Sequence, residues 1–264
     1  MTAGAAAARP HPAMPLALLT DVGVVTARNL RRILRTPRLL SFASIQPIIF
    51  LLLFRYVFGG AIHVPGYTYA NYLLPGLIIE ATLFGATTAV ALATDLSSGL
   101  VDRFRSLPIT RSAVLVARTL ADFCRTIGVI AVVIAAGYLV GFRFRGGAVA
   151  ALAAIGLALA FAYAYSWLLA IIGLAVGDAE TAQLVSTLPI LIFIFASSLA
   201  VPVGTMPGWM QAFARNQPVS VTIDAVRALT QGGPAWHWAW QSLAWSGALL
   251  IVLIPVAVRL YRRR

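Results

Sequence analysis

The sequence predicts an all-α integral membrane protein with six transmembrane helices. The first observation is composition: 60% of the residues are hydrophobic and only 11% are charged, whereas a soluble domain carries about 25% charged residues. The second is that the apolar residues gather in six runs, each close to or longer than the roughly 20 residues that cross a bilayer. The third is the placement of arginine around these runs. The runs lie near 39–58, 70–93, 113–140, 148–176, 181–201 and 238–260.

Arginines orient the six runs. All 20 basic residues are arginine, against 8 acidic residues. One side carries the arginines of 9–38, 103–125 and 259–264. The other side carries only Arg143, Arg145, Arg215 and Arg227. The positive-inside rule therefore places both termini in the cytosol, with Arg143 and Arg145 as a local exception. Because the arginines flank apolar runs, we expect the basic excess to meet membrane lipids and no nucleic acid.

The N-terminal region contains no convincing cleavable signal peptide, since its apolar stretch is short and broken by proline. We expect residues 1–15 to be flexible and 16–264 to form a single domain. Within 16–36, one helical face is apolar and the other carries Arg28, Arg31, Arg32 and Arg35. This pattern favours an interfacial helix on the cytosolic membrane surface, and the alternative is an ordinary cytosolic extension.

The connection before the last run predicts two short amphipathic helices. Pro207-Gly208 and Gln217-Pro218 break the segment at two points. Trp209, Trp236 and Trp238 are suited to the outer membrane interface, where indole rings prefer to lie.

Glu80 is the first candidate functional residue inside the membrane. A carboxylate near the middle of an apolar run is costly and is by default a functional candidate. One alternative is an ion pair with Arg55 that joins two helices. The other is a polar or protonatable group on a substrate path. Gln46 is interpreted as a hydrogen-bonding contact between helices, and the alternative is that Gln46 and Arg55 also lie on the substrate path.

Two further groups of charges have structural interpretations. Arg118, Asp122 and Arg125 have helical spacing and are interpreted as solvated or interfacial pairs on one helix face. Asp178 and Glu180 occupy the short turn between the fourth and fifth runs. They are interpreted as a helix cap with a favourable first-turn charge, and the alternative is a second cytosolic contact for a partner.

Motifs for enzymatic chemistry are absent from the sequence. Cys124 is a single cysteine and the three histidines are far apart, so we expect no metal site. The chain has no lysine for a phosphate-binding loop and no catalytic serine or zinc motif. We therefore expect that it is not an enzyme and binds no ATP itself.

The segment 95–111 is a polar, basic interruption between the second and third runs. Leu100, Phe104 and Leu107 supply apolar side chains, Asp102, Arg103 and Arg105 supply charge, Gly99 loosens the segment and Pro108 ends it. A short helix of this kind can dock in a groove of a soluble partner. The alternative is a plain basic loop that anchors topology.

Five segments carry a resemblance to a known family. They are Asn71-Tyr-Leu-Leu-Pro-Gly76, residues 95–108, Gly141-Phe-Arg-Phe-Arg145, Leu188-Pro-Ile-Leu-Ile-Phe193, and Pro207-Gly-Trp through Asn216-Gln-Pro-Val-Ser220 with Ala228-Leu. In their order and spacing they resemble the membrane subunit of ABC type-2 exporters, in particular the daunorubicin-resistance-type permeases of actinobacteria. The resemblance covers nearly the whole chain from about Leu16.

The resemblance implies a location in the bacterial plasma membrane, outer re-entrant helices before the last span, and a coupling helix at 99–108. Its residues would be Gly99, Asp102, Arg103, Phe104, Arg105, Leu107 and Pro108. It implies two ABC ATPase subunits, which hold ATP and Mg, and a second permease copy or paralogue. The cargo would be a hydrophobic drug, antibiotic or lipid, on a path lined by the second and fifth spans. Phe193 and Phe195 would line that path, or simply pack against neighbouring helices.

Two other functions remain open from the sequence alone. A polytopic lipid-modifying enzyme needs clustered acids, histidines or serines at one membrane face, and the eight acids here are scattered. A non-transporting partner or sensor of an ATPase is not excluded by any residue.

Overall fold

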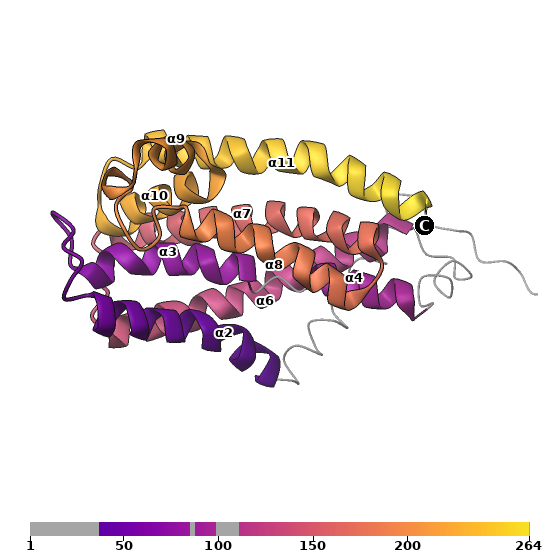
Figure 1. Cartoon of the computed structure of the whole chain (residues 1–264), viewed down its shortest axis with the longest axis horizontal. Coiled ribbons are helices and arrows are strands. Elements are labelled where there is room, and N and C mark those ends of the chain that lie inside the picture. The colour runs from indigo at the N-terminus through magenta and orange to yellow at the C-terminus, as the bar shows by residue number, and fades with distance from the viewer. Residues whose placement is uncertain (1–36, 85–87, 99–110, 264) are drawn as a thin grey trace, which may run out of the picture.

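A computed structural model describes residues 37–84, 88–98 and 111–263, and every regular element within them is a helix (Figure 1). The longer elements are α2 (Pro37–Leu52), α3 (Tyr69–Phe84), α4 (Thr88–Ser97), α6 (Arg111–Leu139), α7 (Gly147–Val176), α8 (Ala179–Phe195), α9 (Gly208–Asn216), α10 (Pro218–Gln231) and α11 (Trp236–Arg263). A π-helical stretch, η1 (Leu53–Phe58), continues α2, and a 3-10 turn, η2 (Val203–Thr205), precedes α9. The predicted interfacial helix at 16–36 and the predicted coupling helix at 99–108 lie outside the described residues.

Four stretches are long and apolar enough to cross a membrane: Tyr69–Ser97, Leu115–Leu139, Gly147–Val176 and Trp236–Tyr261. Two shorter apolar helices, Ala43–Phe58 and Ala179–Phe195, coincide with the first and fifth predicted runs. The second run extends four residues beyond its predicted end at 93. The fifth helix ends at Phe195 rather than 201, because the chain turns at 196–201 to meet α10.

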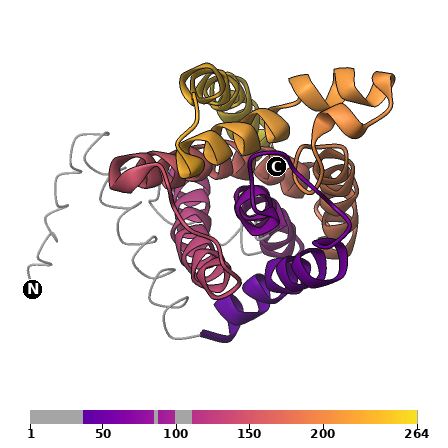
Figure 2. The same ribbon diagram turned by 90° about the vertical axis from the view of Figure 1, so that its left-hand side faces the viewer.

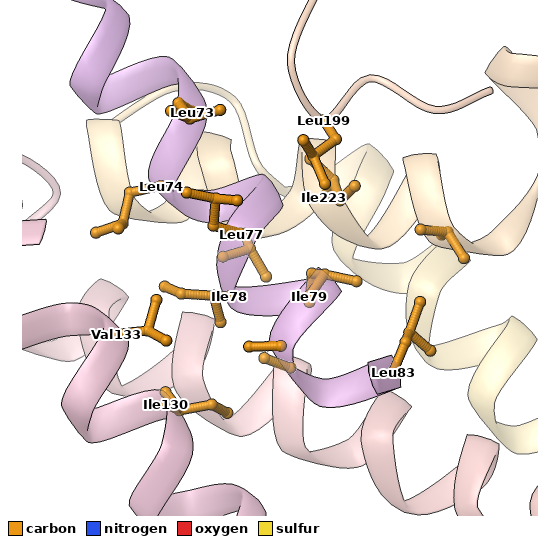
Figure 3. Packing of buried hydrophobic residues seen from close by; sticks show 14 of the residues in the cluster. Leu73, Leu74, Leu77, Ile78, Ile79, Leu83, Ile130, Val133, Leu199 and Ile223 are labelled. Atoms are coloured by element: carbon orange, nitrogen blue, oxygen red, sulfur yellow. The ribbon is translucent and has the colours of Figure 1, made fainter. Parts of the chain in front are cut away.

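Helix α3 is the centre of the bundle. Fifteen of its sixteen residues are buried, from Tyr69 to Leu83. Figure 2, which looks along the bundle, shows the other helices around it. Its leucine and isoleucine side chains meet Ile130 and Val133 of α6 on one side, and Leu199 and Ile223 on the other (Figure 3). Because lipid is as apolar as leucine, such contacts stabilise a membrane bundle through close packing and not through removal of apolar surface from water.

Small residues allow the closest helix contacts. A Cβ atom added to Gly173 of α7 would overlap the backbone carbonyl of Ala89 in α4. A Cβ at Gly76 of α3 would lie 2.9 Å from the Cα of Leu199. Both glycines therefore let backbones approach to a distance that any side chain would prevent, as is common between transmembrane helices.

Short polar signals end and begin the helices. Helix α7 ends at Gly177, which adopts φ +74° and donates its N–H to the carbonyl of Gly173. Asp178 then caps α8 by accepting the Thr181 N–H at 2.8 Å. This hydrogen bond holds the pKa of the Asp178 carboxyl below its usual value. The predicted helix cap is thereby confirmed, while a contact of Asp178 and Glu180 with a partner stays a prediction.

The two ends of the bundle differ. One end, here the α10 end, carries α9 and α10, which form the two predicted amphipathic helices between their proline breaks. Trp209 and Trp236 at this end are largely exposed, at 75% and 82%. The opposite end, the C-terminal end, holds the last turns of α11 (Figure 1). There Leu92 of α4, Leu115 of α6 and Tyr261 of α11 share one buried cluster, so the helices on both sides of 99–110 meet at this end.

Candidate functional site

Glu80 lies fully buried in α3 and bonds to α2. The Gln46 side-chain amide donates to Glu80 Oε1 at 2.8 Å, and Glu80 is 0% exposed. Its Oε2 atom has no hydrogen-bond partner within the described part of the chain. The predicted interhelical contact of Gln46 is present. Since Glu80 is fully buried beside α2, it is closed to a ligand in this arrangement of the helices.

The prediction of an ion pair between Arg55 and Glu80 is wrong. Arg55 lies in η1, where its Nε is 3.5 Å from the carbonyl oxygen of Val140 and its guanidinium is 5.9 Å from the Tyr56 ring. Glu80 instead bonds to Gln46 through Oε1. The physical reason is depth: η1 carries Arg55 toward the α10 end, and Glu80 lies about 16 Å along α3 from Tyr69 at that end.

A second polar group, here the α4–α6 cluster, consists of Thr88, Asp122 and Arg125. The Thr88 hydroxyl donates to Asp122 Oδ2 at 2.8 Å, and Arg125 donates to Asp122 Oδ1 through Nε at 2.9 Å and Nη2 at 2.6 Å. The predicted pairing of Asp122 with Arg125 on one helix face is present. The two side chains are only 7% and 5% exposed, so the prediction that this pair is solvated is wrong. Helix α6 turns this face toward α4, and the charges are enclosed between the two helices. The cluster joins the helices that precede and follow the segment 99–110.

A third group, here the α10 cluster, was not predicted. Arg227 of α10 donates from Nε to the carbonyl of Tyr72 at 3.0 Å and from Nη2 to the carbonyl of Ser198 at 2.6 Å. Its Nη1 bonds to Asp224, and its guanidinium lies 3.8 Å from the centre of the Tyr72 ring. Ser198 also donates its hydroxyl to Asp224 at 2.8 Å. Burial raises the pKa of Asp224, and the Arg227 charge opposes that rise.

The α10 cluster fixes the relative positions of three segments. It ties the first turn of α3 to the chain after α8 through one guanidinium on α10. Gln217 adds a bond from its side-chain amide to the carbonyl of Phe193 at 2.8 Å. The sequence signal that could have found it is the Asp224–Arg227 spacing of three residues on an amphipathic helix, which places both charges on one face.

The two phenylalanines of α8 have different surroundings. Phe193 stacks on Phe213 of α9, with ring centres 5.9 Å apart. Phe195 is 59% exposed and lies 6.5 Å from the Phe50 ring of α2. It belongs to an exposed stripe on α8 at helical spacing, here the α8 stripe. The stripe consists of Leu184, Leu188, Ile192 and Phe195. Phe193 therefore packs against a neighbouring helix, whereas Phe195 belongs to an exposed apolar surface.

These features define a polytopic helical membrane domain with buried polar contacts between its helices. Residues 20–230 match the family model described as ABC-2 type transporter. The chain belongs to this family of transporter membrane domains.

Named relatives are similar over most of the chain. The daunorubicin resistance ABC transporter permease protein DrrB1 of Streptomyces coeruleorubidus is 34% identical over 221 residues, which are 83% of this chain and 78% of the relative. A probable doxorubicin resistance ABC transporter permease protein, DrrC of Mycobacterium tuberculosis, is 30% identical over 84% of this chain and 80% of its own. The doxorubicin resistance permease DrrB of the same species is 28% identical, over 83% and 81%.

Proposed function

We propose that this chain is the permease subunit of an ATP-driven exporter that moves a hydrophobic drug, antibiotic or lipid out of the cytosol or the inner leaflet. The observation that carries the proposal is family membership over residues 20–230, together with relatives whose names refer to daunorubicin and doxorubicin resistance. Six crossings of a bacterial plasma membrane, with the C-terminal end in the cytosol and the α10 end outside, accord with the arginine distribution.

Energy enters from another chain in this proposal. Two ABC ATPase subunits bind ATP and Mg and contact the coupling segment 99–108 of two permease chains, which are identical or paralogous. The flanking helices α4 and α6 are joined by the Thr88–Asp122 hydrogen bond and by the buried cluster that contains Leu92 and Leu115. A movement of the ATPase subunits that displaces the segment 99–108 therefore displaces both helices together instead of separating them. This transfer is a rigid-body movement of packed helices, as in other interface-driven transitions.

Cargo meets the α8 stripe and the neighbouring face of α2 in this proposal. The stripe is uncharged, and the exposed residues Ile45, Ile49 and Leu52 give α2 a second apolar surface. Phe50 of the same helix lies 6.5 Å from the Phe195 ring. An aromatic, largely apolar drug gains contact area on such a surface without burying a charge. Transport then requires that cargo bind the inward-open and outward-open states with different affinities. Glu80 becomes available to cargo only in a state with α2 and α3 apart.

Co-purification with an ATPase tests the proposal. The permease is co-expressed with an ABC ATPase from the same organism and isolated through a tag on the permease. We expect ATPase recovery, and loss of most of it in the double variant Arg103→Ala with Phe104→Ala. The matched control is Arg145→Ala, which removes an exposed arginine on the α10 side of the bundle. Equal recovery in the double variant and the wild type contradicts the coupling assignment.

A further inference from the structure

A groove lies at the α10 end, between α11 and the α9–α10 connection. Its volume is about 420 Å³. Helix α11 supplies one wall through residues at positions i, i+4 and i+8, which share a face. Val221 of α10 and the last turn of α9 supply the other wall. The lining residues are Arg215, Asn216, Val221, Trp240, Gln241, Ala244, Trp245 and Ala248.

The groove changes from polar to apolar along the axis of the bundle. Arg215, Asn216 and Gln241 form its polar end. Ala248 lies seven residues beyond Gln241, about 10 Å further along α11. Trp240 adjoins Gln241 at the polar end and is 48% exposed, whereas Trp245 lies between Ala244 and Ala248 along α11 and is 42% exposed. Half-exposed indoles at this depth are typical of the boundary between headgroups and acyl chains.

The polar end suits an anion. Arg215 uses one Nη2 hydrogen bond, to Gln211 Oε1 at 3.0 Å, which leaves most of its five donors available. Asn216 likewise uses its side-chain amide nitrogen for a bond to the carbonyl of Ala212 at 2.8 Å. Within the described residues the groove lining contains no carboxylate. A planar guanidinium without an acidic neighbour matches a phosphate oxygen pair.

The apolar end suits an acyl chain. Ala244 and Ala248 are exposed alanines on the side of α11 that faces the groove, so the space above them is not filled by a longer side chain. Beyond them, Ile251 and Val252 continue an exposed apolar surface. Of the most apolar 18 residues of α11, only 17% are buried, against 80% for the Tyr69–Ser97 span. Helix α11 is therefore the helix most open to lipid among these candidate spans.

We propose that this groove is a binding site for one glycerophospholipid of the leaflet at the α10 end. Arg215, Asn216 and Gln241 hold the phosphate beside Trp240, and one acyl chain lies over Ala244 and Ala248 beside Trp245. Along α11 the polar Gln241 precedes the two alanines, as the headgroup precedes the acyl chain in the lipid. This site is separate from the α8 stripe and does not depend on transport.

Photo-crosslinking to a lipid tests the site. The full-length permease, without ATPase or drug, is placed in phosphatidylcholine nanodiscs that contain a phosphatidylglycerol with a photoactivatable group in its acyl chain. We expect labelled peptides from 240–252. Arg215→Gln should lower that labelling by up to about fivefold, the upper end of the range for an exposed charge contact. Ala244→Leu fills the groove and should lower it as well.

Controls separate a built site from general surface attraction. Arg145→Gln removes an exposed arginine outside the groove, and Ala148→Leu enlarges an exposed alanine on α7. In both variants, labelling of the peptides from 240–252 should equal that of the wild type. Unchanged labelling in Arg215→Gln, or an equal loss in Arg145→Gln, overturns the proposal. Displacement of the lipid by glycerol 3-phosphate also overturns it, because the groove would then be a site for a free phosphate ester.

Discussion

Removing Asp122 alone should destabilise the protein more than any surface substitution. In Asp122→Ala, the Nε and Nη2 atoms of Arg125 lose their acceptor, and its Nη1 already has no partner in the described part of the chain. Arg125 is 5% exposed, so its whole guanidinium becomes a buried charge without compensation. Removing one member of a buried ion pair lowers the free energy of unfolding by about 3–5 kcal/mol. Thr88→Val removes a single bond to a charged group and should cost about 1.5–3 kcal/mol.

The double variant distinguishes this reasoning from simple loss of packing. Replacing Asp122 and Arg125 together, by leucine and methionine, removes both charges and keeps most of the volume. Such replacements are often neutral or stabilising. The double variant should therefore be more stable than either Asp122→Leu or Arg125→Met alone. The free energy of unfolding is measured in mixed detergent by tryptophan fluorescence, with Arg145→Met as an exposed control expected within about 0.5 kcal/mol of the wild type.

Additive effects of the two substitutions would refute this interpretation. If the double variant lost as much stability as the sum of the singles, the two side chains would not depend on one another. A loss for Arg145→Met as large as that for Arg125→Met would likewise show that burial of Arg125 is not the cause.

Three further predictions concern other contacts. Gly173→Ala should lower the free energy of unfolding by about 1–3 kcal/mol, because the added Cβ overlaps the Ala89 carbonyl. Gly156→Ala on the same helix, where a Cβ meets nothing, should leave that free energy unchanged or raise it by up to about 1 kcal/mol. Both are measured by the same unfolding assay. Arg227→Lys should cost about 3 kcal/mol, because one ammonium cannot replace bonds to Tyr72, Ser198 and Asp224, and rescue by lysine would contradict the α10 cluster. Asp178→Ala should destabilise α8 more than Asp178→Asn at neutral pH. Because the folded-state pKa of Asp178 is lowered, its carboxylate cap is present above the unfolded pKa and is lost as the pH falls through the folded value. The difference between Asp178→Ala and the wild type should therefore shrink in acid, and a constant difference would contradict the cap.

Local patterns predicted most of the helices correctly. The apolar runs at 148–176 and 238–260 correspond to α7 and α11 within a few residues. Pro207-Gly208 and Gln217-Pro218 mark the starts of α9 and α10. Pro218 is the first residue of α10, a position that suits proline because it lacks an N–H, and Pro207 directly precedes α9. Asp178 marked the start of α8 for a similarly local reason. Each of these signals depends only on residues close in sequence.

Partners of buried polar groups could not be predicted in the same way. The sequence predicts Glu80 as a functional candidate, but its bond to Gln46 instead of Arg55 depends on how α2 and η1 are placed beside α3. The spacing of Asp122 and Arg125 favours a solvated or interfacial pair, because it does not reveal that this face of α6 meets α4. For Arg227, the sequence indicates only a charge on one side of the membrane. In all three cases, the deciding contact joins residues that lie far apart in the sequence or in different helices.

Reconstituted transport is the most direct measurement of the proposed export activity. Proteoliposomes hold the permease and its ATPase, with the ATP-binding side outward, and uptake of doxorubicin into the lumen is followed by fluorescence. In this orientation export appears as uptake into the lumen, and the proposal predicts that uptake requires ATP and Mg. The double variant Arg103→Ala with Phe104→Ala should lose this uptake, and Arg145→Ala should retain it. Uptake that proceeds equally without ATP, or that survives the double variant unchanged, would contradict the proposal that an ATPase drives this permease through residues 99–108.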